Sequence, residues 1–114
     1  MIGDQVYLTH IRDAIEKIES YVAVGLEVFM NTSHWQDAVI RQLEIIGEAT
    51  KRLSPALREQ HNYVPWRRIA GLRDVLIHDY MGVDLEAVWG ISQRDVPELK
   101  KYVLAFLDEM ENKT

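Results

Sequence analysis

The chain has 114 residues, of which 47% are apolar and 27% charged, and its 13 basic and 18 acidic residues give a net charge of −5. This length and composition predict one ordered domain over residues 1–114 and exclude a largely disordered chain. The lack of cysteine excludes disulfides and thiolate metal sites. The negative charge argues against binding nucleic acid by bulk charge alone, but it leaves room for a local basic patch inside a cleft.

The sequence lacks the signatures of export and membrane insertion. Its first residues do not combine a basic segment with an apolar run, so no signal peptide is expected. No apolar run approaches the roughly 18 residues that a membrane span needs. Because cysteine is also absent, we expect a cytoplasmic protein that does not contact membranes.

In the first half of the chain, apolar residues recur every three or four positions, which is typical of amphipathic helices. Asp4 is expected to cap a first helix that Gly25 ends or bends. Ser33 and Gln36 fit a capping box at the start of a second. The two apolar stripes are Leu8, Ile11, Ile15, Ile18 and Val22, and then Val39, Leu43, Ile46, Ala49 and Leu53.

In the second half, Ser54 and Pro55 predict the cap and first position of a short helix, and Pro65 suits the start of a third main helix. Asp84 is expected to cap a fourth segment, in which Pro97 marks a kink or a new start. The expected apolar positions are Trp66, Ile69, Leu72 and Leu76, then Leu85, Val88 and Trp89, then Leu99, Val103, Phe106 and Met110. The pattern predicts an all-α, up-down bundle of four main helices with a short accessory helix.

Residues 69–80 hold the most informative motif, R-x-x-x-x-H-x-Y, formed by Arg73, His78 and Tyr80. The planar arginine fork matches phosphate oxygens, and histidine exchanges protons near neutral pH. The tyrosine hydroxyl can form a hydrogen bond or be modified. Together these groups suit the handling of a phosphodiester without a metal ion. The spacing alone is weak evidence, because histidines at helix ends and tyrosines in bundles commonly have structural roles.

If the substrate is RNA, the 2′-hydroxyl is the nucleophile, and the reaction needs a base, an acid and a cation that stabilises the phosphate charge. A single His78 supplies only one proton transfer at a time, whereas a symmetric dimer brings two copies together. At about 100° per residue, Arg73 and His78 lie roughly 140° apart around an ideal helix. Either the helix unwinds near Asp79 or a second subunit completes the site, and we favour the dimer.

Further charged residues have two interpretations each. Asp74 precedes His78 by four positions, so it either orients the imidazole or forms a surface ion pair, with equal weight. A second set of basic side chains forms either a patch that follows RNA phosphates or a solvated face, and the solvated face is the default. This set consists of Arg41, Lys51, Arg52, Arg67 and Arg68.

The motif and its surroundings resemble the HepT-like family of the HEPN (higher eukaryotes and prokaryotes nucleotide-binding) superfamily. The resemblance runs in order through almost the whole chain. It rests on Tyr7-Leu-x-x-Ile-x-x-Ala-Ile15, Arg41-Gln-Leu-Glu-Ile-Ile-Gly-Glu-Ala49, Val64-Pro-Trp66, Ile69-Ala-Gly-Leu-Arg73, His78-Asp-Tyr80, Val83-Asp84, Val88-Trp89 and Asp95-Val-Pro-x-Leu99. The combined pattern is far more specific than the motif alone.

The resemblance implies a helical homodimer whose paired motifs line a shared cleft. It also implies a metal-independent endoribonuclease toxin without a cofactor, from a type VII-like toxin–antitoxin pair, with transfer RNA among the family's substrates. Arg73 and His78 match the catalytic pair. The implied partner is a minimal nucleotidyltransferase of the MntA type, which transfers AMP to Tyr80. In such proteins asparagine often follows the motif arginine; here Asp74 is expected to repel the scissile phosphate and weaken cleavage.

Two other functions are compatible with the sequence. One is a catalytically silent helical dimer that binds a nucleotide or the nucleotidyltransferase, with the motif as a phosphate-holding cleft. The other is a structural bundle in which Arg73, His78 and Tyr80 are individually dispensable. Incubation of the unmodified protein with RNA separates the enzyme from both, since only the enzyme cleaves.

Overall fold

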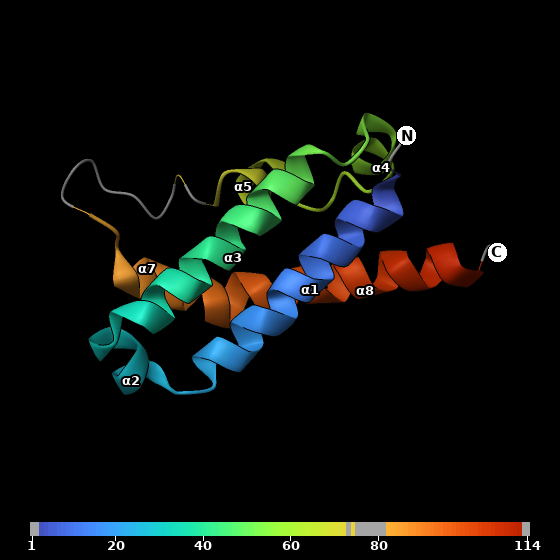
Figure 1. The fold of residues 1–114 in the computed structure, drawn as a ribbon. Helices are drawn as coiled ribbons and strands as arrows, with labels where there is room; N and C mark the ends of the chain where they lie inside the picture. Colours follow the sequence, from blue (N-terminus) through green and yellow to red (C-terminus); the bar gives the residue numbers. More distant parts are fainter. Residues whose placement is uncertain (1–2, 73, 75–81, 113–114) are drawn as a thin grey trace.

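The computed structural model describes residues 3–72, 74 and 82–112, which form helices with no strand among them (Figure 1). The long helices are α1 (Asp4–Val22), α3 (Ser33–Lys51) and α8 (Val96–Asn112). The short ones are α2 (Leu26–Asn31), α4 (Pro55–Gln60), α5 (Trp66–Ala70) and α7 (Leu85–Gly90), and a π-helical turn, η2 (Ile91–Asp95), joins α7 to α8. The predicted all-α bundle is confirmed.

Helices α1 and α3 run side by side, α8 packs across α1, and α5 packs against α3 (Figure 1). The apolar stripes predicted for these helices form one core, because each faces its neighbours rather than solvent. Fully buried members include Leu8, Ile15, Leu43, Ile46 and Val103. Val22 and Met110, at the ends of their stripes, are only partly buried.

The connection between α1 and α3 contains a helix that the sequence pattern did not predict. Gly25 adopts φ 94°, a left-handed conformation that glycine tolerates, and serves as the N-cap of α2. Phe29 of α2 is fully buried. The capping box predicted at Ser33 is wrong, because Thr32 is the N-cap of α3 and no side chain caps it. Gln36 instead donates from Nε2 to the carbonyl of Phe29, 2.9 Å away, and so ties α3 to α2.

The start of α1 is tied to the start of α4. Gly3, not Asp4, is the N-cap of α1, so the predicted cap is wrong by one residue. The Asp4 carboxylate instead accepts hydrogen bonds from the backbone N–H and the hydroxyl of Ser54, both at 2.7 Å. Ser54 caps α4 as predicted, since its Oγ accepts from the N–H of Leu57 at 3.1 Å. One carboxylate therefore joins two helix starts that are far apart in sequence.

Of the remaining helix starts, the cap predicted at Asp84 is confirmed, whereas Pro65 is the N-cap of α5 rather than its first residue. The Asp84 carboxylate accepts from the N–H of Ala87 at 3.0 Å and caps α7, as predicted. Pro97 lies inside the uninterrupted helical stretch that runs from α7 through η2 into α8, where its missing N–H removes one helical hydrogen bond directly after the π-helical turn. In the part of the chain that is described, no helix is long and apolar enough to cross a membrane.

Candidate functional site

The three principal motif residues, Arg73, His78 and Tyr80, lie outside the described residues. Of the predicted site, the structure describes Asp74, which is exposed. It also describes the segment that leads into the motif, which is α5 followed by Gly71 and Leu72. The geometry of this scaffold therefore fixes where the motif segment begins.

Gly47 of α3 sets how closely α5 approaches. A Cβ at this buried position would lie 2.9 Å from the carbonyl oxygen of Ala70, closer than real side-chain contacts allow. Ile69 and Leu72, on either side of this contact, are buried against the core. The helix pair is thus in direct backbone contact three residues before Arg73, where no flexible side chain can absorb a change.

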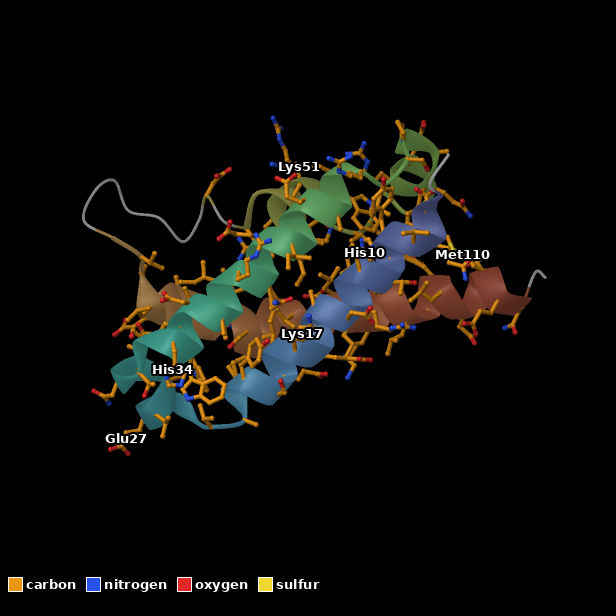
Figure 2. All side chains as sticks on the ribbon, in the orientation of Figure 1. His10, Lys17, Glu27, His34, Lys51 and Met110 are labelled. Atoms are coloured by element: carbon orange, nitrogen blue, oxygen red, sulfur yellow. The ribbon has the colours of Figure 1, made fainter. Side chains whose placement is uncertain are left out.

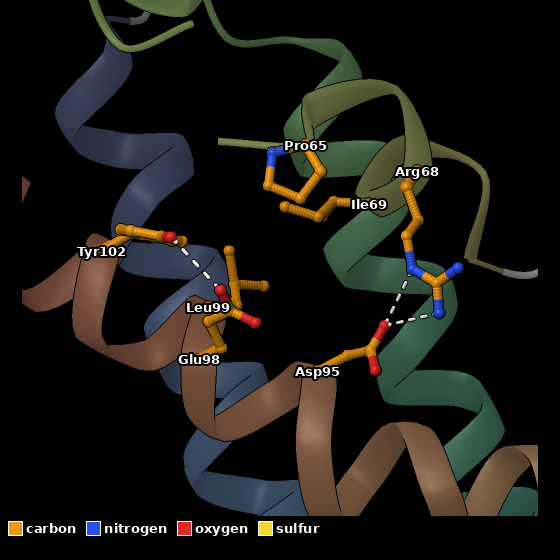
Figure 3. A pocket seen from close by; sticks show the side chains of 7 residues that line it. All are labelled: Pro65, Arg68, Ile69, Asp95, Glu98, Leu99 and Tyr102. Atoms are coloured by element: carbon orange, nitrogen blue, oxygen red, sulfur yellow. Dashed lines mark hydrogen bonds and ion pairs between the residues drawn. The ribbon is translucent and has the colours of Figure 1, made fainter. Parts of the chain in front are cut away.

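The other side of α5 is attached to α8 and η2. Arg68 donates to Oδ2 of Asp95 from Nη2 at 2.8 Å and from Nε at 3.0 Å (Figure 3). The two residues border a pocket of about 240 Å³ between the helices. Its lining is completed by Pro65, Ile69, Glu98, Leu99 and Tyr102.

A hydrogen bond closes the far wall of this pocket, where Tyr102 donates its hydroxyl to Oε1 of Glu98 at 3.3 Å (Figure 3). Loss of hydration, and then the adjacent Glu98 carboxylate, raise the pKa of the Tyr102 phenol. The phenol therefore stays protonated and remains a donor. Because the rim carries the carboxylates of Asp95 and Glu98, this pocket is unsuited to a phosphate group.

Toward α3, the start of the motif segment borders an acidic hollow of about 90 Å³. Its charged lining residues are Glu44, Glu48, Asp74 and Lys51. Lys51 pairs with Glu48 at 3.4 Å. The backbone N–H of Asp74 donates to the carbonyl of Gly71 at 2.9 Å. That Asp74 orients His78 stays a prediction, since His78 lies outside the described residues.

Toward α4, the same segment borders an open groove of about 690 Å³, which we call the arginine groove. It is lined by Arg58, Asn62, Val64, Pro65, Trp66, Arg67, Arg68 and Gly71. No aspartate or glutamate contributes to this lining. The groove and the acidic hollow thus give the two sides of the motif's entry opposite charge.

The five basic residues for which the sequence left open a patch or, by default, a solvated face do not line one common surface. Arg67 and Arg68 line the arginine groove, whereas Arg41 and Arg52 line a separate hollow of about 320 Å³ between α1 and α3. Arg58 was not predicted from the sequence, because the pattern does not show how α4 is placed relative to α5. A signal was nonetheless present, since Arg58 follows the recognised start of α4 by one helical turn.

The described side chains offer no evident metal site. Within residues 3–72, 74 and 82–112, no group of three or more histidine, aspartate or glutamate side chains is arranged to hold a metal ion.

Comparison with known proteins identifies the family. The family model described as Ribonuclease HepT-like matches residues 11–106. No solved structure matches. A protein of Thermococcus cleftensis named "Probable ribonuclease HepT" is 44% identical over 82% of this chain and 86% of its own length. A "Putative RNase" of Caldanaerobacter subterraneus is 42% identical over 90% of this chain and 93% of its own length.

A longer relative is also similar. A Methanocaldococcus jannaschii protein named "Gamma-glutamylcyclotransferase and putative RNase" is 44% identical over 94% of this chain. The chain spans only 49% of that protein's length. The family match extends through α1, α3, α5 and the motif into α8, and therefore includes the scaffold described above. The chain belongs to the ribonuclease HepT-like family.

Proposed function

We propose that the chain is a metal-independent endoribonuclease in which two copies form one active site. The family match over residues 11–106, which includes the whole motif, is the observation that carries this proposal. The relatives named as ribonucleases support it. Arg73 stabilises the charge on the phosphate, His78 transfers protons and Tyr80 positions the substrate.

The reaction is a transesterification. His78 of one chain takes the proton of the RNA 2′-hydroxyl, and the 2′-oxygen forms a bond to phosphorus. The bond between phosphorus and the 5′-oxygen breaks, and His78 of the second chain donates its proton to that oxygen. The products are a 2′,3′-cyclic phosphate and a 5′-hydroxyl. No metal ion enters this scheme, because Arg73 neutralises the developing charge.

The products give a direct test of this function. We expect the purified, unmodified protein to cleave RNA in the presence of a metal chelator, leaving 2′,3′-cyclic phosphate ends. Labelled RNA separated on a denaturing gel, with and without enzymatic removal of the cyclic phosphate, measures both. The catalytically silent binding dimer predicts RNA or nucleotide retention without new ends. Cleavage that disappears with chelator would contradict the mechanism.

The same site suits control by a modifying partner. In this proposal the chain is the toxin of a toxin–antitoxin pair, and a minimal nucleotidyltransferase transfers AMP from ATP to Tyr80. The tyrosine oxygen bonds to the α-phosphorus, and pyrophosphate leaves. The added group carries negative charge two residues from His78, where it repels RNA phosphates and blocks the cleft.

Tyr80→Phe tests this control, because it removes only the hydroxyl that would accept AMP. Co-expressed with such a nucleotidyltransferase, the unsubstituted chain is expected to gain the mass of AMP and lose ribonuclease activity. The Tyr80→Phe chain is expected to gain no mass. Its cleavage rate, lowered by the loss of the hydroxyl that positions the substrate, is expected to be the same with and without the nucleotidyltransferase. Intact-mass spectrometry and a cleavage assay on the same sample measure both results.

Tyr63→Phe is the matched control for this experiment, since Tyr63 is 61% exposed and lies outside the motif. It is expected to be modified and inactivated like the unsubstituted chain. AMP on the Tyr80→Phe chain would place the acceptor elsewhere.

A further inference from the structure

The arginine groove concentrates positive charge in a protein whose net charge is −5. Of its arginines, Arg68 is paired with Asp95. Arg58 and Arg67 have no ion pair or side-chain hydrogen bond to any residue that the structure describes. Two positive charges in the groove are therefore not compensated by the described chain, and their field favours an anionic ligand.

The Arg58 side chain is partly withdrawn from solvent. The residue is half-buried, and within the described chain its Nε is a buried nitrogen with no hydrogen-bond partner. Removing a guanidinium nitrogen from water without supplying an acceptor is unfavourable. An anion next to the groove would supply the charge compensation that this guanidinium lacks among the described residues.

The floor of the groove is apolar and fixed. Trp66 is 8% exposed and Val64 is 3% exposed. The Trp66 indole donates from Nε1 to the carbonyl of His61 at 3.0 Å, which fixes its orientation. A rigid apolar floor between cationic walls matches a ligand that combines phosphate charge with flat, weakly polar rings, as a nucleotide chain does.

The charges around the motif segment also indicate the direction in which a bound nucleotide chain would extend from the motif. Gly71, which lies two residues before Arg73, lines the groove on one side of the motif segment. On the other side, Glu48 and Asp74 line the acidic hollow. A polyanion bound at the motif is repelled toward α3 and attracted toward α4.

We propose that the arginine groove binds the phosphates of RNA nucleotides adjacent to the cleaved bond. This inference rests on the proposed function and adds to it the path of the substrate. Arg58 and Arg67 are positioning residues, because they hold RNA at a distance from the reacting phosphate. Arginine side chains beside an apolar floor suit nucleotide units, which carry both phosphate and base, better than a single small anion.

The test measures RNA binding apart from cleavage. A fluorescent single-stranded RNA is titrated with His78→Ala protein, which is expected to bind without cutting, at several salt concentrations. Adding Arg67→Gln is expected to weaken binding roughly tenfold. It is also expected to make the slope of log affinity against log salt shallower by about 0.7, the loss of one phosphate contact. Arg67→Lys should restore most of the slope.

Lys17→Gln is the matched control, because it removes the same charge from an exposed site on α1 (Figure 2). It is expected to leave affinity and slope nearly unchanged. Since Arg58 is half-buried, Arg58→Lys is the second variant, with folding checked by circular dichroism. It keeps the charge and loses the planar fork, so a weaker affinity with a nearly unchanged slope is expected.

Cleavage assays with His78 intact separate the two proposals. If the unsubstituted chain cleaves RNA and Arg67→Gln changes neither KM nor the binding slope, the groove proposal is wrong and the function stands. If the unsubstituted chain binds RNA but does not cleave it, and Arg67→Gln weakens binding, the groove stands and the function fails. If an acidic peptide binds the groove more tightly than RNA does, its ligand is a protein and the inference is overturned.

Discussion

His78→Ala is expected to abolish RNA cleavage and growth arrest while leaving the chain folded. Positioned proton transfer contributes about 10²- to 10⁴-fold to rate, and His78 performs both transfers in the two-chain site. The loss is therefore expected at or beyond the upper end of that range. Single-turnover cleavage of a labelled RNA measures it, and circular dichroism with size-exclusion chromatography checks the fold and the assembly.

His34→Ala is the matched control, since His34 is an exposed histidine at the start of α3, outside the motif (Figure 2). It is expected to cleave at the unsubstituted rate. If His78→Ala cleaves RNA as fast as the unsubstituted chain does, His78 takes no part in the mechanism.

A mixture of unsubstituted and His78→Ala chains tests whether two chains share one active site. If subunits exchange at random, a one-to-one mixture of unsubstituted and His78→Ala chains contains about a quarter fully active dimers. The measured activity is then expected near a quarter of that of the same total amount of unsubstituted protein. An activity near one half would indicate that each chain works alone.

Gly47→Val is expected to cause the largest loss of stability among the substitutions considered. The new Cβ would meet the backbone oxygen of Ala70 at 2.9 Å, so α5 must move away from α3. Overpacking of this kind costs about 1–3 kcal/mol, which corresponds to a fall in Tm of roughly 5–15 °C for a domain of this size. Thermal unfolding followed by circular dichroism measures it.

Displacing α5 also moves the backbone that leads into the motif. Gly47→Val is therefore expected to lower kcat/KM at a temperature at which the variant is still folded, because small displacements of reacting groups cost rate. An unchanged kcat/KM in the folded variant would show that the approach of α5 to α3 does not position the site.

Gly47→Ala and Gly90→Ala form a matched pair of helical substitutions. A Cβ at Gly90 meets the Nη2 atom of Arg94 at 2.9 Å, and this flexible side chain can turn away. Gly90→Ala is therefore expected to be neutral, or to stabilise by up to about 1 kcal/mol through helix propensity. Gly47→Ala gains the same propensity but must move backbone atoms, so it is expected to be the less stable of the two.

The sequence was sufficient for the features of the fold that depend on local periodicity. Residues three and four apart share a helix face, so the buried stripe of Leu8, Ile11 and Ile15 follows from spacing alone. The caps at Ser54 and Asp84 were likewise predictable, because each needs only a side-chain oxygen three residues before an N–H.

Features that depend on tertiary arrangement could not be predicted in this way. The Asp4 carboxylate looked like a local cap but bonds to Ser54, and Gln36 bonds to Phe29 rather than closing a capping box. In both cases the side chain has a local and a distant partner available, and only the packing of the helices decides between them. The close contact between the backbones of Gly47 and Ala70 could not be predicted either, because glycine has no side chain that contributes to an apolar or polar pattern.

The candidate site likewise has features that could be predicted from the sequence and features that depend on tertiary arrangement. The motif and the family resemblance were visible in the sequence, and comparison confirmed the family. The roles of Arg73, His78, Tyr80 and Asp74 stay predictions. The arginine groove was not visible in the sequence, because Arg58 and Arg67 come from different helices and the pattern does not show that these helices line one groove.

The hydrogen bonds of Asp4 make the beginning of α1 a remote support for the arginine groove. Asp4 holds Ser54, Ser54 holds the first turn of α4, and α4 carries Arg58 into the groove. Two sets of hydrogen bonds and the backbone of α4 thus connect the first turn of α1 to the guanidinium of Arg58. If the groove binds RNA as proposed, a change at Asp4 is expected to alter RNA affinity while leaving the chemical groups of the motif unchanged.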